Sequence, residues 1–205
     1  MSSELDYASI SPYTDEEAVA ALHRVAQNPF LPIVSKFLFP DEPFYTLRRL
    51  LKSIGSIDEF QQVVMSKMIM TVIQRSSSGF SFDGLGNIPR DRKFLAVSNH
   101  RDIILDPAMI QWTLFHNELP LTEICVWSNL LDSNRMVSDL LRSNRMIKVI
   151  RGISARELYL SSKLLSSYIR SRIVSGGSSV WIAQREGRTK NGLTRQSRDC
   201  SKCLI

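Results

Sequence analysis

The residues with the clearest chemical potential lie in the stretch Phe94-Leu-Ala-Val-Ser-Asn-His-Arg-Asp-Ile-Ile-Leu-Asp-Pro107. It places His100 close to two aspartates, Asp102 and Asp106. A carboxylate that accepts the proton of one imidazole nitrogen fixes the tautomer, so that the other nitrogen can act as a base. Such a pair can deprotonate a hydroxyl and direct its oxygen at an acyl carbonyl. The alternative is an ordinary histidine–aspartate ion pair without catalytic function.

A second polar cluster follows the apolar run that ends near residue 150. Arg151 is followed by Gly152 and by Ser154, which is typical of the residue that precedes a helix. A guanidinium beside a helix N-terminus can bind phosphate oxygens, and the free backbone N–H groups add to the attraction. The alternative is an arginine that is solvated in a loop or paired with a carboxylate.

A third cluster follows the apolar run that ends at Ala183. Here Glu186, Gly187 and Arg188 stand together, and Arg185 and Lys190 add positive charge. Gly187 would allow the backbone to turn tightly. Taken alone, this segment could also be a charged turn.

The elements that must position these clusters are short strands alternating with helices. We expect strands at 94–98, 123–128, 146–150 and 180–183, and helices at about 107–116, 130–142 and 155–174. This alternation predicts an α/β fold, with a mainly parallel sheet flanked by helices. Active crevices in such sheets lie at the carboxyl ends of the strands. His100, Arg151 and Glu186 should therefore meet at one edge.

The first part of the chain has a different pattern. It predicts a helical N-terminal segment over residues 1–78, followed by an α/β domain over 79–205. Residues 1–13 are expected to form a loosely attached arm, and a helix at 57–75 should have one broad apolar face. The proline- and phenylalanine-rich stretch 29–46 is either packed irregular structure or a membrane contact, and burial is the favoured reading. Capping boxes predict three helix starts; the pairs are Thr14 and Glu17, Ser56 and Glu59, and Ser154 and Glu157.

These three clusters, in this order, resemble the glycerol-phosphate and lysophosphatidate acyltransferase superfamily. That family carries a His-x4-Asp block, an arginine-glycine block and a Phe-Pro-Glu-Gly-Thr-Arg block. Asn99 to Pro107 is similar to the first, Val149 to Gly152 to the second, and Trp181 to Arg188 to the third. The resemblance covers about residues 80–192.

The resemblance implies that His100, oriented by Asp106 or Asp102, activates the hydroxyl of a glycerol-phosphate or lysophospholipid acceptor. The oxygen would then attack the thioester of an acyl-CoA or acyl-ACP donor, which is a co-substrate, so no cofactor, metal or covalent acyl-enzyme is implied. The residues that would bind the acceptor or order the site are Asn99, Arg101, Arg151, Gly152, Glu186, Gly187 and Arg188.

The chain departs from the family pattern in three places. Five residues, not four, separate His100 from Asp106. Either the turn absorbs an extra residue or Asp102 is the orienting carboxylate. Asp106 is favoured, because Asp-Pro at the start of a helix is similar to the family's usual context. Gln184 and Arg185 replace Phe-Pro, and the arginine after Glu-Gly comes one place early, at Arg188. The family usually continues into another strand and a fourth block, so we expect a domain that is incomplete at its C-terminus.

Composition limits the partners. Lys and Arg number 26 against 20 Asp and Glu, a net charge of +6, which favours anionic partners such as phosphate groups or an anionic membrane surface. No aromatic–basic platform points to nucleic acid. Three cysteines suggest a reducing compartment, and no apolar run reaches the length of a bilayer span. We expect a cytoplasmic protein, peripheral to the inner face of a membrane and without a transmembrane span.

Two other functions fit the same residues. A thioesterase or esterase would use the His–Asp pair with water as the acceptor. An inactive module that binds lipid surfaces would keep the basic character of the chain without the chemistry.

Overall fold

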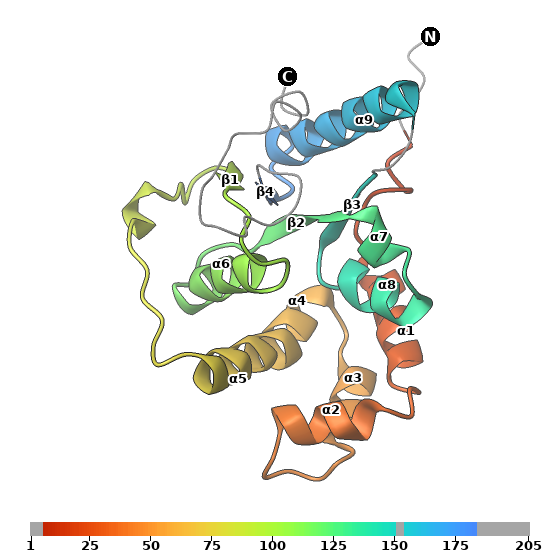
Figure 1. Cartoon of the computed structure of the whole chain (residues 1–205), viewed down its shortest axis with the longest axis vertical. Helices are drawn as coiled ribbons and strands as arrows, with labels where there is room; N and C mark the ends of the chain where they lie inside the picture. The colour runs from red at the N-terminus through yellow and green to blue at the C-terminus, as the bar shows by residue number, and fades with distance from the viewer. Residues whose placement is uncertain (1–5, 151–153, 184–205) are drawn as a thin grey trace. The chain divides into compact units, whose positions relative to one another are not determined.

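The structure is a computed structural model that describes residues 6–150 and 154–183. The chain forms two compact units (Figure 1). The helical unit holds residues 12–83 and 130–146, and the sheet unit holds the other described residues. The helical unit therefore takes a segment from the middle of the chain as well as its early part. The division of the sequence into domains at residue 78 stays a prediction.

The sheet unit is built on four parallel strands in the order β1-β4-β2-β3. This confirms the predicted α/β fold with a parallel sheet flanked by helices. The bounds are β1 Leu95–Ser98, β2 Thr122–Trp127, β3 Met146–Val149 and β4 Ser179–Ala183. In the register, Ser98 lies opposite Ala183. Neighbouring strands β1 and β4 thus end at the same level, on the carboxyl edge of the sheet.

Helices cover both faces of this sheet. In Figure 1, α9 (Ala155–Val174) and α6 (Leu105–His116) lie on opposite sides of it. Every residue of β4 is buried, as expected for a central parallel strand with helices on both faces. Val180 packs in a core with Leu165 and Ile169 of α9. Successive side chains alternate between faces, so Trp181 belongs to the other face.

The sequence signals at the ends of α9 act as predicted. Ser154 accepts a hydrogen bond from the backbone of Glu157, whose side chain accepts one from the Ser154 backbone, which completes the capping box. After the helix, Gly176 takes a left-handed φ of 72°, a conformation that glycine adopts without strain.

A buried polar network joins α9 to β2. The Tyr168 hydroxyl donates to Glu123 Oε2 at 2.8 Å, and Arg172 Nε donates to Glu123 Oε1 at 2.7 Å. Glu123 is almost fully buried, so these donors offset the cost of removing its charge from water. Burial, and after it the charge of Glu123, raises the pKa of Tyr168 above its ordinary value.

The expectation of a loose N-terminal arm is wrong for residues 6–11. Ile10 is buried in the α9 core, and its carbonyl accepts a hydrogen bond from the Lys148 backbone N–H at 2.9 Å. Tyr7 lies edge-on to Tyr168, and its hydroxyl is 2.9 Å from that of Ser167. The side chains of Tyr7 and Ile10 therefore pack this segment against α9, although most of the residues around them are polar.

The helical unit packs short helices around one core. Leu22, Leu38, Leu51 and Phe60 are all nearly inaccessible to solvent within it. The helices are α1 Asp15–Val25, α2 Leu31–Leu38, α3 Thr46–Ser53, α4 Ile57–Phe60, η1 Gln61–Met65, α5 Ser66–Ser76 and α8 Arg135–Arg142. The two remaining short elements are α7 Ser128–Leu131 and η2 Leu85–Asn87.

Three predicted elements of this unit differ in detail. The helix expected at 57–75 is continuous but contains a wider π-helical turn, η1. The helix expected at 130–142 is interrupted, because the Asn134 side chain caps α8 by accepting from the Val137 N–H. The stretch 29–46 is not irregular throughout, because α2 begins with proline in its first turn, a position that proline tolerates. The expected burial of this stretch is wrong for Phe30, Phe37 and Phe44, which are 69%, 42% and 57% exposed.

One carboxylate holds α8 against α1. Asp139 accepts hydrogen bonds from Arg24 Nε and Nη2, at 2.9 and 2.7 Å, and from the Tyr13 hydroxyl at 3.0 Å. Asp139 is 2% exposed, so the pair satisfies a charge that would otherwise be costly to bury. This contact ties the middle segment of the chain to the N-terminal helices.

No helix of the described part combines the length and the hydropathy that a bilayer span requires.

Replacing Tyr168 by Phe should weaken the fold in a pH-dependent way. Near pH 8 we expect a loss of about 1 kcal/mol in the free energy of unfolding, the usual contribution of a hydrogen bond. Because the folded pKa of Tyr168 is raised, the unfolded tyrosine ionises first, so wild-type stability begins to fall above about pH 10 and keeps falling until the pH reaches the folded pKa. The gap between the two proteins should therefore shrink towards about pH 11 in urea unfolding.

Tyr159→Phe is the matched control, since Tyr159 lies on the same helix and is 67% exposed. A gap for Tyr168→Phe that stays constant over this pH range would contradict the argument.

Candidate active site

The site begins where β1 leaves the sheet. Trp181 Nε1 on the adjacent strand donates to Ser98 Oγ at 3.1 Å, and the Ser98 hydroxyl donates to the Asn99 carbonyl at 2.9 Å. These bonds fix the last residue of β1 and the first residue of the turn. The chain then passes through His100 and enters α6 five residues later.

His100 is held against one of the two candidate aspartates. Its Nδ1 lies 3.1 Å from Asp106 Oδ2. The side chains of His100 and Asp106 are 6% and 21% exposed, so the pair is screened from water much more than a surface ion pair. An ionised carboxylate only accepts hydrogen bonds, so Nδ1 must carry the proton in this contact. In the neutral imidazole, Nε2 then carries the lone pair.

The same carboxylate oxygen organises the turn. Asp106 Oδ2 also accepts from the backbone N–H groups of Arg101, at 2.7 Å, and of Asp102, at 3.0 Å. Asp106 lies in the first turn of α6, where the positive end of the helix dipole favours a carboxylate. Backbone, helix end and imidazole therefore all act on one oxygen.

Asp102 has a different position. Its Oδ1 accepts from the N–H groups of Ile104 and Leu105, both at 2.9 Å. These are donors at the start of α6 that have no partner within the helix. Its side chain thus closes the turn before α6, and this turn accommodates the extra residue between His100 and Asp106.

The other sequence-predicted residues divide into two groups. Asn99 and Arg101 flank His100 and are exposed at the carboxyl edge of the sheet. The rest lie outside the described residues: Arg151, Gly152, Glu186, Gly187 and Arg188. The strands that precede them, β3 and β4, run parallel to β1 and end at the same edge. β4 is next to β1, whereas β3 is at the opposite side of the sheet.

Sequence reasoning missed two contributors to this site. One is the Ser98–Trp181 bond across the strand ends, and the other is the set of backbone donors on Asp106. The first depends on strand order, which a single sequence does not reveal. The second had a local signal, because Asp-Pro at a helix start places a carboxylate beside free N–H groups.

Within the described ranges, no group of three or more His, Cys, Asp or Glu side chains could hold a metal ion. The pair Cys200 and Cys203 lies outside these ranges.

Comparison with known protein families decides the family. The acyltransferase family model matches residues 79–199, which is more than half of the chain. The chain belongs to this acyltransferase family. It is the family of glycerol-3-phosphate and 1-acylglycerol-3-phosphate acyltransferases, as the three sequence blocks indicated. No curated protein and no solved structure gives a significant match to the acyltransferase. The matched stretch contains His100, Asp102 and Asp106.

Asp102 and Asp106 bind different backbone N–H groups, so removing either carboxylate should affect a different part of the turn. Asp106→Ala should speed amide hydrogen exchange at Arg101 and Asp102, because both N–H groups lose their acceptor. Asp102→Ala should speed exchange at Ile104 and Leu105 and lower the free energy of unfolding by about 1 kcal/mol, the usual cost of losing a helix cap. Each variant is the control for the other in NMR-detected exchange.

The same exchange pattern in both variants would show that the turn unfolds as a whole, and the assignment of separate roles would fail.

Proposed function

We propose that this acyltransferase moves a fatty acyl group from an acyl thioester, acyl-CoA or acyl-ACP, to the hydroxyl of a glycerol-phosphate or lysophospholipid acceptor. His100 is the general base in this proposal, and Asp106 orients it. The observation that carries it is the contact of 3.1 Å between His100 Nδ1 and Asp106 Oδ2, inside the stretch that matches the family model.

The chemistry follows from the tautomer. With its Nδ1 proton held by Asp106, the imidazole accepts the acceptor's hydroxyl proton at Nε2 while the oxygen attacks the thioester carbonyl. The tetrahedral intermediate collapses by breaking the carbon–sulfur bond, and the imidazolium returns its proton to the departing thiolate. Asp106 stabilises the imidazolium formed in between. The products are the acylated acceptor and the free thiol of the carrier.

The acceptor phosphate calls for cationic and N–H donors at the same edge. Arg101 lies beside His100 and is exposed, and guanidinium groups suit phosphate oxygens. By their match to the family blocks, we propose that Asn99, Arg151, Gly152, Gly187 and Arg188 also bind the acceptor or order the site, and that Glu186, whose carboxylate only accepts hydrogen bonds, orders the site. Support comes from the parallel strands β3 and β4, which lead to the last five of these residues from the edge that holds His100.

Asp102 serves the site indirectly in this proposal. Because its carboxylate satisfies the first N–H groups of α6, it fixes the start of the helix that carries Asp106. A positioning role of this kind predicts a smaller kinetic effect than that of Asp106.

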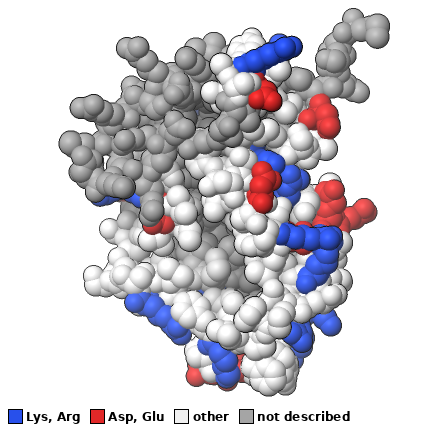
Figure 2. All heavy atoms as spheres, turned by 45° about the vertical axis from the view of Figure 1, so that its right-hand side comes forward, with Lys and Arg blue, Asp and Glu red and all other residues white. Residues whose placement is uncertain are grey.

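We further propose that the reaction takes place at an anionic membrane surface on the cytoplasmic side. Acyl chains and lysophospholipids partition into lipid, and the net charge of +6 favours an anionic surface. On the face seen in Figure 2, basic side chains are dispersed among acidic ones and do not form one large basic patch. The charge distribution on this face therefore does not show which residues would contact the membrane.

Replacing His100 by Ala should lower kcat/KM for acyl transfer by about 10²–10⁴-fold, the usual contribution of a general base. The assay follows thioester consumption and acylated product, with glycerol 3-phosphate or a lysophospholipid as the acceptor. His116→Ala is the matched control, since His116 is an exposed histidine on α6. Unchanged turnover in a folded His100→Ala protein would refute the mechanism. Release of free fatty acid regardless of acceptor would instead identify a thioesterase.

Asp106→Asn should separate charge from geometry. The amide oxygen can still accept from the N–H groups of Arg101 and Asp102, but the charge that stabilises the imidazolium is lost. We expect kcat to fall by at least about 10²-fold, with local structure kept. Asp102→Asn should change kcat by less than about tenfold. Equal losses in both variants would contradict the assignment of Asp106 as the orienting carboxylate.

A further inference from the structure

The outward side of α2 carries apolar residues where a surface helix normally carries polar ones. Phe30, Ile33, Val34 and Phe37 follow the spacing i, i+3, i+4 and i+7, which places them on one stripe of the helix. They are 69%, 70%, 43% and 42% exposed. We call these four residues the α2 stripe. Single exposed apolar residues are ordinary, but a contiguous stripe marks an interaction surface.

The opposite side of α2 is already occupied by the core of its own unit. Leu31 and Leu38 are buried there, and the buried Ser35 hydroxyl accepts from the Leu47 N–H at 3.1 Å. Lys36 Nζ donates to the carbonyls of Pro40 and Glu42, at 3.1 and 2.7 Å. Both polar side chains of α2 are thus engaged within the unit. Helices that are apolar on all sides occur in cores and membranes.

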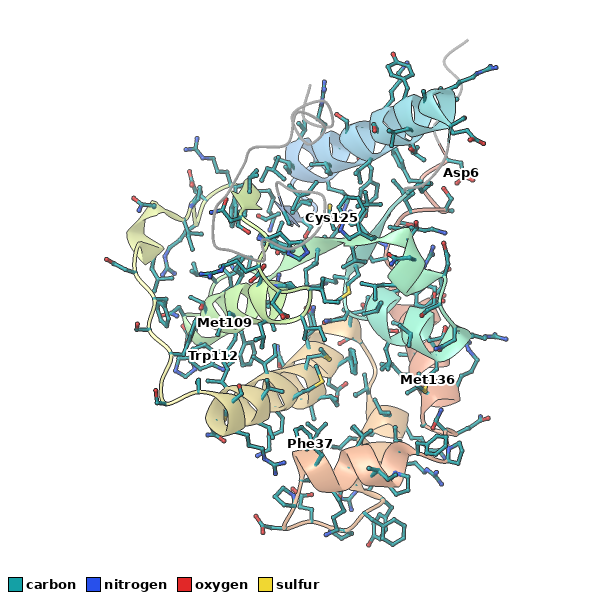
Figure 3. The ribbon with its side chains drawn as sticks, in the orientation of Figure 1. Asp6, Phe37, Met109, Trp112, Cys125 and Met136 are labelled. Carbon is teal, nitrogen blue, oxygen red and sulfur yellow. The ribbon has the colours of Figure 1, made fainter. Side chains whose placement is uncertain are left out.

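Basic residues accompany the stripe. Arg75 of α5 lies over the Phe37 ring, 4.4 Å from its centre, and Figure 3 shows Phe37 between α2 and α5. Lys67, also on α5, lies 6.0 Å from the ring centre of Phe39. Neither α2 nor α5 contains an acidic residue. An apolar stripe with Arg75 over one of its rings, and a second cation on α5, fits an interface of acyl chains and anionic headgroups.

The size of the stripe argues against a second copy of the chain as the partner. At roughly 200 Å² for a large exposed side chain, the stripe offers about 400 Å². A stable protein interface takes about 800 Å² from each partner. Insertion of a few large apolar side chains into lipid has no such minimum, since each contributes through its own buried area.

We infer that the α2 stripe docks the protein on an anionic phospholipid surface, with the Phe and Ile side chains among the acyl chains and Arg75 and Lys67 at the headgroups. This rests on the proposed function, which places the reaction at a membrane surface without naming the residues in contact. The aromatic pair Phe44 and Tyr45, both half exposed, follows α2 in the chain and adds side chains suited to a lipid interface.

The test measures co-sedimentation of the full chain with phosphatidylglycerol-containing vesicles and with pure phosphatidylcholine vesicles. We expect stronger binding to the anionic vesicles. The double variant Phe30→Ser, Ile33→Ser should need at least about tenfold more lipid for half-maximal binding, because it removes the two most exposed side chains of the stripe. Arg75→Gln should reduce the preference for phosphatidylglycerol.

The matched control is Leu160→Ser, Val174→Ser, which removes two apolar side chains of α9 that are 53% and 85% exposed. This control should bind vesicles like the wild type, and circular dichroism should show that both double variants are folded. Equal binding by the stripe variant and the wild type would overturn the inference. So would a lack of vesicle binding by the wild type, or a wild-type dimer that the stripe substitutions dissociate.

The outcome is separable from that of the proposed function. Acyl transfer between soluble donor and acceptor, measured without vesicles, should be the same in the stripe variant and the wild type. Stripe-dependent vesicle binding in a chain without transferase activity would sustain the docking surface and reject the enzyme. Acyl transfer by a chain whose vesicle binding does not depend on the stripe would support the enzyme and reject the docking surface.

Discussion

The structure of the candidate site depends on one carboxylate oxygen, Asp106 Oδ2. It accepts from two consecutive backbone N–H groups and lies within hydrogen-bond distance of the His100 imidazole. The backbone bonds close the turn between β1 and α6, and the contact with Nδ1 selects the imidazole tautomer. The same carboxylate therefore determines both the conformation of this turn and the tautomer of its histidine.

The parallel sheet places the end of a second strand beside this turn. Because β1 and β4 are adjacent and end level with one another, the end of β4 lies beside the start of the turn that holds His100. The bond between Trp181 and Ser98 joins the two strands at that point. Near the amino end of the central strand β2, Glu123 holds α9 through hydrogen bonds from Tyr168 and Arg172. The candidate site thus lies at the carboxyl edge of the sheet, whereas the Glu123 network lies near the amino end of β2.

Much of this arrangement follows from local sequence signals. The capping pair Ser154 and Glu157 and the glycine at 176 fix both ends of α9, because each acts on backbone groups within a few residues. Strand positions follow from short apolar runs between turn residues. The preference for Asp106 over Asp102 as the partner of His100 has another source, because it rests on the resemblance of the Asp-Pro helix start to the family's usual context.

What the sequence did not reveal depends on contacts between distant segments. The burial of Ile10 against β3 and α9, and the capture of residues 130–146 by the N-terminal helices through Asp139, need partners more than 100 residues away in the chain. The α2 stripe is of the same kind. The pattern of Phe and Ile in residues 29–46 cannot say which apolar side faces the core, because both sides of α2 are apolar.

The two roles of Asp106 also affect how the site can vary. A histidine that acts as a base needs only a lone pair and a fixed orientation, so its requirements are met by a contact to a single atom. The orienting residue must in addition satisfy the N–H groups of a turn whose length depends on the spacing to the helix. With five residues instead of four between His100 and Asp106, the additional residue creates a longer turn, and the carboxylate of Asp102 satisfies the N–H groups of Ile104 and Leu105. A spacing of five residues is therefore compatible with a direct His–Asp contact, because a second aspartate supports the longer turn.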